Sequence, residues 1–209
     1  MTFLYAIRYF HVVPVVPPLF SAAFTIAVGA SALRLMSDAS AAADALTPVL
    51  FLQLFVASSG FKFAARRGYY DLLLTSGTPR WQIAFAHCLV SITPGLVSWL
   101  CVAAVELVAT GGRNWVSFAP VTCAAFVGAS LIAWSVAVFS SRTATTVLWL
   151  LVMSIPATAR AFSPVQLLAA PWSSSTRVVV GVTCAAAVIG FAVAVAYIVR
   201  GSTPLEAAQ

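Results

Sequence analysis

The sequence predicts an all-α membrane protein, a single domain over residues 1–209 with six transmembrane helices. Its residues are 62% hydrophobic and only 8% charged, and its mean hydropathy is +1.01. A helix that crosses about 30 Å of hydrocarbon needs roughly 20 mostly apolar residues. Six such segments follow one another with no long polar loop between them, which leaves no room for a separate soluble domain. The segments run near 12–33, 46–65, 83–109, 118–140, 143–159 and 178–199.

The N-terminal stretch MTFLYAIRYF places Phe3, Ile7 and Phe10 at helical spacing. This pattern predicts a short helix in the membrane interface before the first span, although a simple extension of that span fits equally well. Arg8, the apolar run and Ala30-Ser31-Ala32 also loosely match a secretory signal, but the run is longer than a signal needs. We therefore expect the first span to be retained.

The basic residues predict the orientation in the membrane. With the N-terminus in the cytoplasm, seven basic residues fall inside and four outside, as the positive-inside rule requires. The inner set is Arg8, Lys62, Arg66, Arg67, Arg80, Arg142 and Arg200, and the outer set is Arg34, Arg113, Arg160 and Arg177. We expect a multi-pass protein of the cell membrane with both termini cytoplasmic, and this distribution of charge over loops argues against a nucleic-acid partner.

The loop between the second and third segments, RRGYYDLLLTSGTPRWQ at 66–82, is the most patterned part of the chain. Gly68 can end the second span, and the following residues form about two helical turns, with Asp71 in the first turn. Thr78 is then expected to cap the third span, with Pro79 at the first helical position. From these residues alone, the loop could be a connector held by its arginines on anionic lipid.

The same loop resembles the cytoplasmic loop of type-2 ATP-binding-cassette (ABC) transporter permeases, which are six-span membrane subunits. The matching positions are Arg67, Gly68, Asp71, Leu72-Leu73-Leu74, Thr75 and Arg80-Trp81. SSRTAT at 140–145, at the start of the fifth segment, is also similar to that family. Two positions depart from its pattern, since Ser76-Gly77 follow the Thr where many members have Pro, and His87 replaces a basic residue.

The resemblance implies that the short helix between the second and third spans is a coupling helix that docks on a separate P-loop ATPase subunit. The positions that take this role are Arg66, Arg67, Gly68, Tyr69, Tyr70, Asp71, Leu72, Leu73, Leu74, Thr75 and Arg80. It further implies two ATPase copies carrying ATP and Mg, and a second six-span permease subunit, identical or related. The expected function is ATP-driven export of a lipid, drug, peptide or glycan.

The chain carries no catalytic motif of its own. A phosphate-binding P-loop needs Gly-Lys followed by Ser or Thr, whereas the one lysine, Lys62, lies between Phe61 and Phe63. The sequence also holds no recognisable catalytic triad and no metal-ligand spacing, and its four cysteines all fall within expected spans. We therefore expect a non-enzymatic subunit that binds no cofactor or metal itself.

Three polar residues inside the expected spans are candidates for function. Glu106 is one because burying its charge is costly, although a structural pairing with Arg113 is the alternative. Gln53 borders the central cavity if the resemblance holds, or else hydrogen-bonds a neighbouring helix. His87 is expected to be packed or to face water. A stand-alone secondary transporter centred on Glu106 or His87, or a membrane scaffold, is the alternative function.

Small residues at four-residue spacing predict close helix packing in two of the spans. They are Ala125, Ala129, Ala133 and Ala137 in the fourth span, and Ala186, Gly190 and Ala194 in the sixth.

Overall fold

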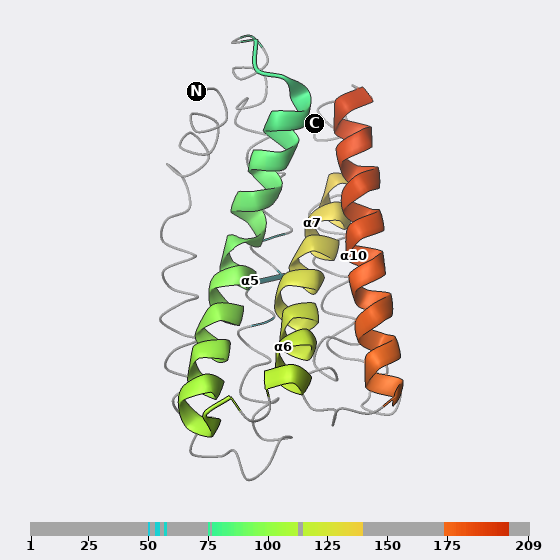
Figure 1. Ribbon diagram of the computed structural model, residues 1–209. Helices are drawn as coiled ribbons and strands as arrows, with labels where there is room; N and C mark the ends of the chain where they lie inside the picture. Colours follow the sequence, from blue (N-terminus) through green and yellow to red (C-terminus); the bar gives the residue numbers. More distant parts are fainter. Residues whose placement is uncertain are drawn as a thin grey trace.

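The computed structural model is all-helical in the part that it describes, which comprises residues 50, 53, 54, 57, 75, 77–112, 115–139 and 174–200. Its elements are α5 (Arg80–Thr110), α6 (Trp115–Cys123), the π-helical turn η1 (Ala124–Gly128), α7 (Ala129–Phe139) and α10 (Ser174–Arg200) (Figure 1). The α6–η1–α7 run is continuous.

Three helices are long and apolar enough to cross a membrane, so this is a membrane-embedded protein. They cover Arg80–Ala104, Trp115–Phe139 and Ser174–Arg200. These bounds confirm the third, fourth and sixth expected spans to within a few residues. The N-terminal interfacial helix and the first and fifth spans lie outside the described residues, as does the second span except for Leu50, Gln53, Leu54 and Ala57.

The α6–η1–α7 span lies between α5 and α10 and runs antiparallel to α5 but parallel to α10 (Figure 1). Contacts fix both directions. Along α7 and α10, Ser135 meets Gly190 and Phe139 meets Tyr197, so both sequence numbers rise together. Between α5 and this span the numbers run oppositely, since Trp134 meets His87 and Ser130 meets Gly95.

The start of α5 differs from the expected cap by one residue. Pro79 is the capping residue, with φ −59° and ψ 136°, and the helix begins at Arg80 without a side-chain cap. The carbonyl of Pro79 accepts hydrogen bonds from the N–H groups of Gln82 at 2.9 Å and Ile83 at 3.3 Å. The expected cap at Thr78 is therefore wrong by one residue, because the extended Pro79 takes that position and closes the first turn through its own carbonyl.

Two consecutive glycines turn the chain from α5 into α6. Gly111 and Gly112 both adopt positive φ, 62° and 78°, a conformation that costs glycine little. The N–H of Trp115 donates to the carbonyl of Gly112 at 3.2 Å, which closes the turn. The antiparallel arrangement of α5 and α6 therefore follows from a very short connection.

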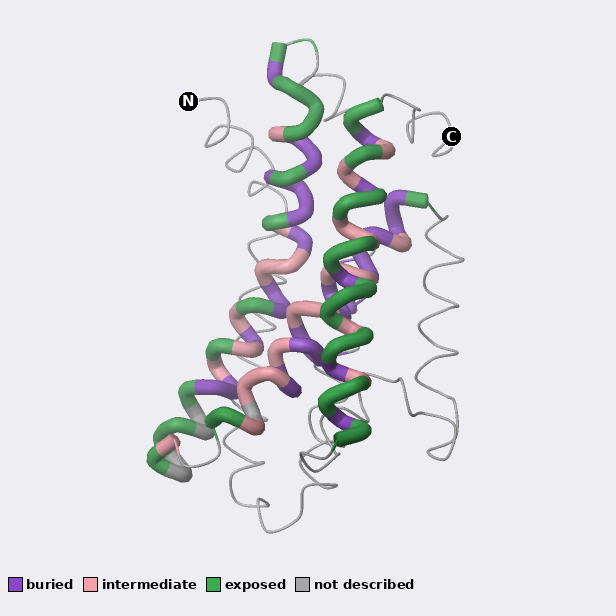
Figure 2. The backbone as a smooth tube through the Cα atoms, turned by 45° about the vertical axis from the view of Figure 1, so that its right-hand side comes forward, coloured by how far each residue is buried: buried purple, intermediate pink, exposed green. Residues whose placement is uncertain are grey.

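Two clusters of buried apolar residues occupy different levels of the bundle. As labels for position alone, the end of the bundle where α5 begins and α10 ends is called inner, and the opposite end outer. The inner cluster joins α5, α7 and α10 through Ile83, Ala84, Ala86, Cys88, Trp134, Val138, Ala194 and Ile198. The outer cluster joins α6 and η1 to α10 through Val121, Ala124, Ala125 and Val180. In Figure 2 the α6–η1–α7 span is mostly purple and pink whereas α10 is largely green, so the middle span is the most buried of the three.

The small-residue stripe of the fourth span is confirmed, because all four of its alanines are buried. The stripe expected in the sixth span is confirmed at Gly190, which packs against Ser135, and at Ala194, which is buried, but it is wrong at Ala186, which is exposed. The buried face of α10 also carries Val180 and Ala187, which with Ala194 are spaced seven residues apart. A seven-residue spacing keeps one face of a helix on a neighbour that it crosses at a shallow angle.

Gly95 is a point of close approach between α5 and the α6–η1–α7 span. A Cβ built on Gly95 would lie 2.6 Å from Ser130 Oγ and 2.7 Å from the carbonyl oxygen of Phe126. The second of these is a backbone atom, which cannot move aside as a side chain can.

Replacing Gly95 by alanine should therefore destabilise the protein by about 1–3 kcal/mol, because the two helices must be forced apart. Thermal unfolding of the purified protein in detergent measures the effect. The matched control is Gly181→Ala, since nothing lies within 4 Å of a Cβ at that position. Equal stability of the two variants would contradict the close approach.

Candidate functional site

The predicted coupling segment reaches the described bundle through its last residues. Thr75 is helical and exposed, and Gly77, with φ 76°, turns the chain toward α5. Arg80 is the exposed first residue of α5. The other positions of the coupling motif, residues 66–74, lie outside the described residues. The structure therefore shows where this segment is attached, at the inner cluster of the bundle.

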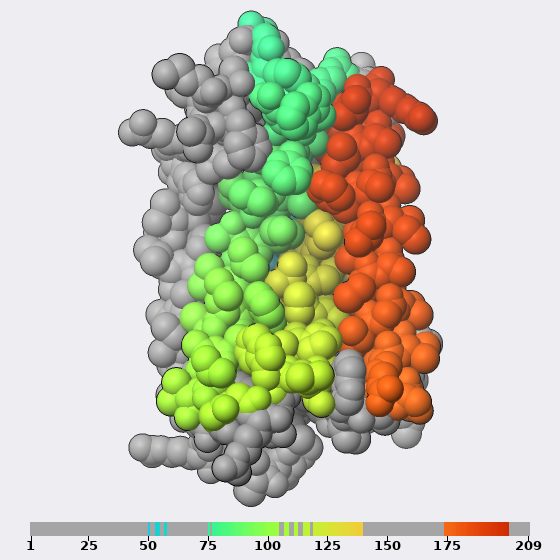
Figure 3. Space-filling model, in the orientation of Figure 1, coloured from blue at the N-terminus to red at the C-terminus, as the bar shows by residue number. Residues whose placement is uncertain are grey.

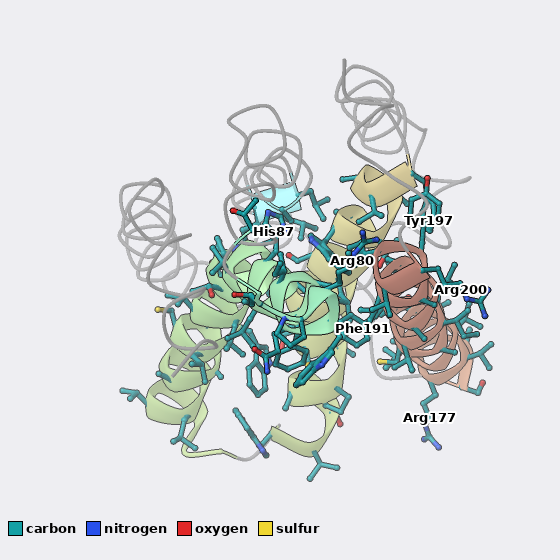
Figure 4. The ribbon with its side chains drawn as sticks, turned by 90° about the horizontal axis from the view of Figure 1, so that it is seen from above. Arg80, His87, Arg177, Phe191, Tyr197 and Arg200 are labelled. Carbon is teal, nitrogen blue, oxygen red and sulfur yellow. The ribbon has the colours of Figure 1, made fainter. Side chains whose placement is uncertain are left out.

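The end of the bundle that carries Arg80 also carries the C-terminal residue of α10, Arg200 (Figure 4). Arg177 lies near the opposite end of α10, and both α10 arginines extend away from the bundle (Figure 4). Trp81, next to Arg80, is 55% exposed. An exposed Trp beside an Arg is typical of a helix end at the membrane–water interface. Basic residues therefore stand at both ends of the spans, and an exposed Trp stands at the end that carries Arg80.

His87 and Trp134 form a buried hydrogen bond between α5 and α7. The indole Nε1 of Trp134 donates to Nδ1 of His87 at 2.9 Å, and both residues are almost fully buried. Because Nδ1 accepts, the ring proton of the neutral imidazole sits on Nε2. Ser91 Oγ lies 3.5 Å from the same Nδ1, one turn along α5. His87 is thus a packed residue, one of the two arrangements expected.

Aromatic contacts extend this hydrogen bond to α10. The ring of Trp134 lies 6.0 Å from that of Phe191, and Phe85 meets Phe191 edge-on at 6.3 Å. Such offset and edge-on pairs are favourable geometries that add to the burial of the rings. The set Phe85, His87, Trp134 and Phe191, here called the inner lock, therefore fastens α5 to both of its described neighbours.

Gln53 is fully buried, and neither its Nε2 nor its Oε1 has a hydrogen-bond partner among the described residues. The described part of its segment is seen at mid-height behind the gap between α5 and α7 (Figures 1 and 3). A bond from this amide to a neighbouring helix, the structural alternative, is not formed within the part of the chain that the structure describes, and its place in a transport path stays a prediction. An unpaired amide in a low-dielectric interior is costly.

Glu106 lies in the last part of α5, as expected, but its side chain is outside the described set, and so is Arg113. Among the described residues, no three of His, Cys, Asp and Glu come together as a metal site would require. All four cysteines lie in described helices and none forms a disulfide.

The inner lock was not predicted from the sequence. Trp134 looks like any apolar residue of a span, and its hydrogen-bond partner lies 47 residues away. The one available signal is that a Trp deep within a span needs an acceptor for its N–H, and His87 and Ser91 are polar residues one turn apart.

Comparisons of the chain with protein-family models, with curated proteins and with solved structures find no match.

Trp134→Phe should lower the stability by about 1–3 kcal/mol, because it leaves the buried Nδ1 of His87 without its indole donor. A double-mutant cycle with His87→Leu separates the hydrogen bond from the lost ring volume, because the two residues are in contact. Thermal unfolding of both single variants and the double variant beside the wild type gives the coupling energy. If the two losses simply add, the hydrogen bond is not what stabilises the lock.

Proposed function

We propose that this chain is the six-span permease subunit of an ATP-driven exporter of the ABC class, and that residues 66–80 are where its ATPase binds. The observation that carries the proposal is the motif RRGYYDLLLTSGTPRW, which ends on the first turn of α5. A docking segment can transmit a displacement only if it is attached to a rigid part of the bundle. The first turns of α5 meet this need, because Ile83, Ala84 and Ala86 are buried in the inner cluster.

The direction of the described helices supports a further crossing between α7 and α10. These neighbouring helices are parallel, so Phe139 and Ser174 lie at opposite ends of the bundle. The chain that joins them has to return across the membrane thickness, and the apolar segment near 143–159 can do so. Together with the apolar segments near 12–33 and 46–65, this gives the six spans of the proposal.

The ends of the described helices support the proposed orientation. Arg80 and Arg200 lie at one end and Arg177 lies toward the other. Placing the first end in the cytoplasm also puts Arg66, Arg67 and Lys62 on the positive side of the membrane, together with both termini.

The proposed mechanism is a rigid-body push. ATP and Mg bind to two partner ATPase subunits, whose closure moves the helix at 68–75. Arg66, Arg67 and Arg80 flank that helix, and Leu72, Leu73 and Leu74 supply its apolar surface. Because the inner lock joins α5 to α7 and α10, a displacement of Arg80 carries three helices rather than one. A second permease subunit, identical or related, completes the path.

The alternative, a secondary transporter that uses His87 or Glu106 to carry protons, gains nothing from the described contacts. His87 is enclosed, and its Nδ1 already accepts the Trp134 N–H, so protonating that nitrogen would break the lock. Gln53 remains the better candidate for a residue of the transport path, because its amide is buried and has no hydrogen-bond partner among the described residues.

Affinity purification of the intact protein in mild detergent, with mass spectrometry of what co-purifies, tests the proposal. A P-loop ATPase should be recovered with the wild type and lost with Leu73→Arg. The control is Val116→Arg, which places the same charge at an 81% exposed position on the opposite end of the bundle and should retain the ATPase. No ATPase from a well-folded wild-type preparation would overturn the exporter and favour the stand-alone alternative.

Cysteine labelling tests the orientation separately. In a variant without its native cysteines, Val116→Cys should react with a membrane-impermeant maleimide added to intact cells, whereas Thr75→Cys should react only after the cells are opened. Both positions are exposed in the bundle, so membrane side alone distinguishes them. The reverse pattern would place the coupling segment outside and exclude a cytoplasmic ATPase partner.

A further inference from the structure

The middle span, α6–η1–α7, leaves one of its sides open between α5 and α10. Three partly exposed residues lie on this side at four-residue spacing, Cys123, Val127 and Leu131. In the space-filling view, atoms of this span are uncovered between α5 and α10 (Figure 3), which diverge toward their outer ends (Figure 1). The three helices therefore form a groove, with the middle span as its floor and α5 and α10 as its walls.

Aromatic rings close this groove at its inner end. Phe85 of α5 meets Phe191 of α10 edge-on at 6.3 Å, and the ring of Trp134 lies 6.0 Å from that of Phe191. Leu131, the innermost of the floor residues, packs against the inner cluster together with Ile92 and Phe191. A hydrocarbon chain that enters the groove from the outer end can therefore extend as far as these rings and no farther.

Helical spacing identifies the residues that line the two walls. Seven residues make nearly two turns of a helix, so residues at this spacing return to the same side. The wall residues are found by counting outward in steps of seven from the pair of rings that meet. They are Phe85, Ile92 and Trp99 on α5, and Phe191, Cys184 and Arg177 on α10. Cys184 and Arg177 are exposed, so the α10 wall is open at these positions.

Arg177 is the charged member of this set and lies at the outer end of the groove, in the first turn of α10. Its side chain extends away from the bundle (Figure 4). Arg177 and Phe191 are 14 residues apart, which is about 21 Å along the helix. One leaflet contributes roughly 15 Å of hydrocarbon to a membrane. The groove is therefore long enough to cross one leaflet, and it is basic where that leaflet meets water.

We propose that this groove binds one phospholipid of the leaflet at the outer end of the bundle. One acyl chain lies over Cys123, Val127 and Leu131 and ends at the ring of Phe191, and the phosphate binds the guanidinium of Arg177. A guanidinium has five N–H donors and can hold a phosphate through two of them while it contacts other groups. A charge at one end and an apolar course match a phospholipid better than a second copy of this chain. The inference goes beyond the proposed exporter and does not depend on it.

Native mass spectrometry of the delipidated protein in mild detergent, titrated with phosphatidylglycerol, tests the site. The wild type should bind one lipid per chain before any further lipid adds. Arg177→Gln should raise the dissociation constant of this first lipid about tenfold, because the phosphate loses its charged donor. The matched control is Arg200→Gln, which removes the same charge from the other end of α10 and should bind as the wild type does.

A second variant, Cys184→Trp, fills the groove with an indole and should also weaken binding of the first lipid. Its control is Val182→Trp, at an exposed position nearly opposite the buried Val180 on the helix. Thermal unfolding without lipid checks that all four variants fold as the wild type does.

Three results would overturn the site. The first is a wild type that binds no phosphatidylglycerol. The second is binding that Arg177→Gln or Cys184→Trp leaves unchanged. The third is an equal loss in a variant and its control, since the lipid would then bind the surface of α10 without using the groove.

Discussion

The hydrogen bond from Trp134 to His87 is the interaction on which the arrangement of the described helices depends. Inside a membrane there is no water to satisfy a polar group that loses its partner, so a hydrogen bond between two spans fixes their register. This bond joins α5 to α7 at one level, and the tilted contact between the rings of Trp134 and Phe191 brings α10 to the same level. Ile83, Ala84 and their apolar neighbours then fill the space around it.

The two levels of the bundle are consequently packed in different ways. At the inner end, aromatic rings and a buried hydrogen bond join three helices. Further along α5, the contact with the α6–η1–α7 span is made by small groups, Gly95 against Ser130. A force applied at Arg80, as the proposed coupling role requires, is therefore passed to three helices together.

Hydropathy was sufficient to predict three spans that the structure bears out, because the requirement for an apolar segment of membrane length leaves few alternatives. Hydropathy could not predict details that depend on packing against neighbouring helices. The α5 cap moved from Thr78 to Pro79 because the proline carbonyl closes the first turn, and the buried stripe of α10 runs through Ala187 rather than Ala186. No sequence pattern predicts the π turn η1.

At the site, the motif at 66–80 is a local pattern and could be recognised from the sequence. The hydrogen bond between His87 and Trp134 and the buried amide of Gln53 depend on the packing of segments that are far apart in the sequence, so they could not be predicted from it.

The claim that residues 66–80 are gripped by an ATPase is tested most directly by placing a photo-reactive amino acid at Tyr70 in living cells and identifying the cross-linked product. The account predicts a covalent adduct with a P-loop ATPase, and none when the same amino acid stands at Val116, at the opposite end of the bundle. Adducts with lipid alone at Tyr70 would contradict this claim, because residues 66–80 would then bind the membrane surface and not an ATPase.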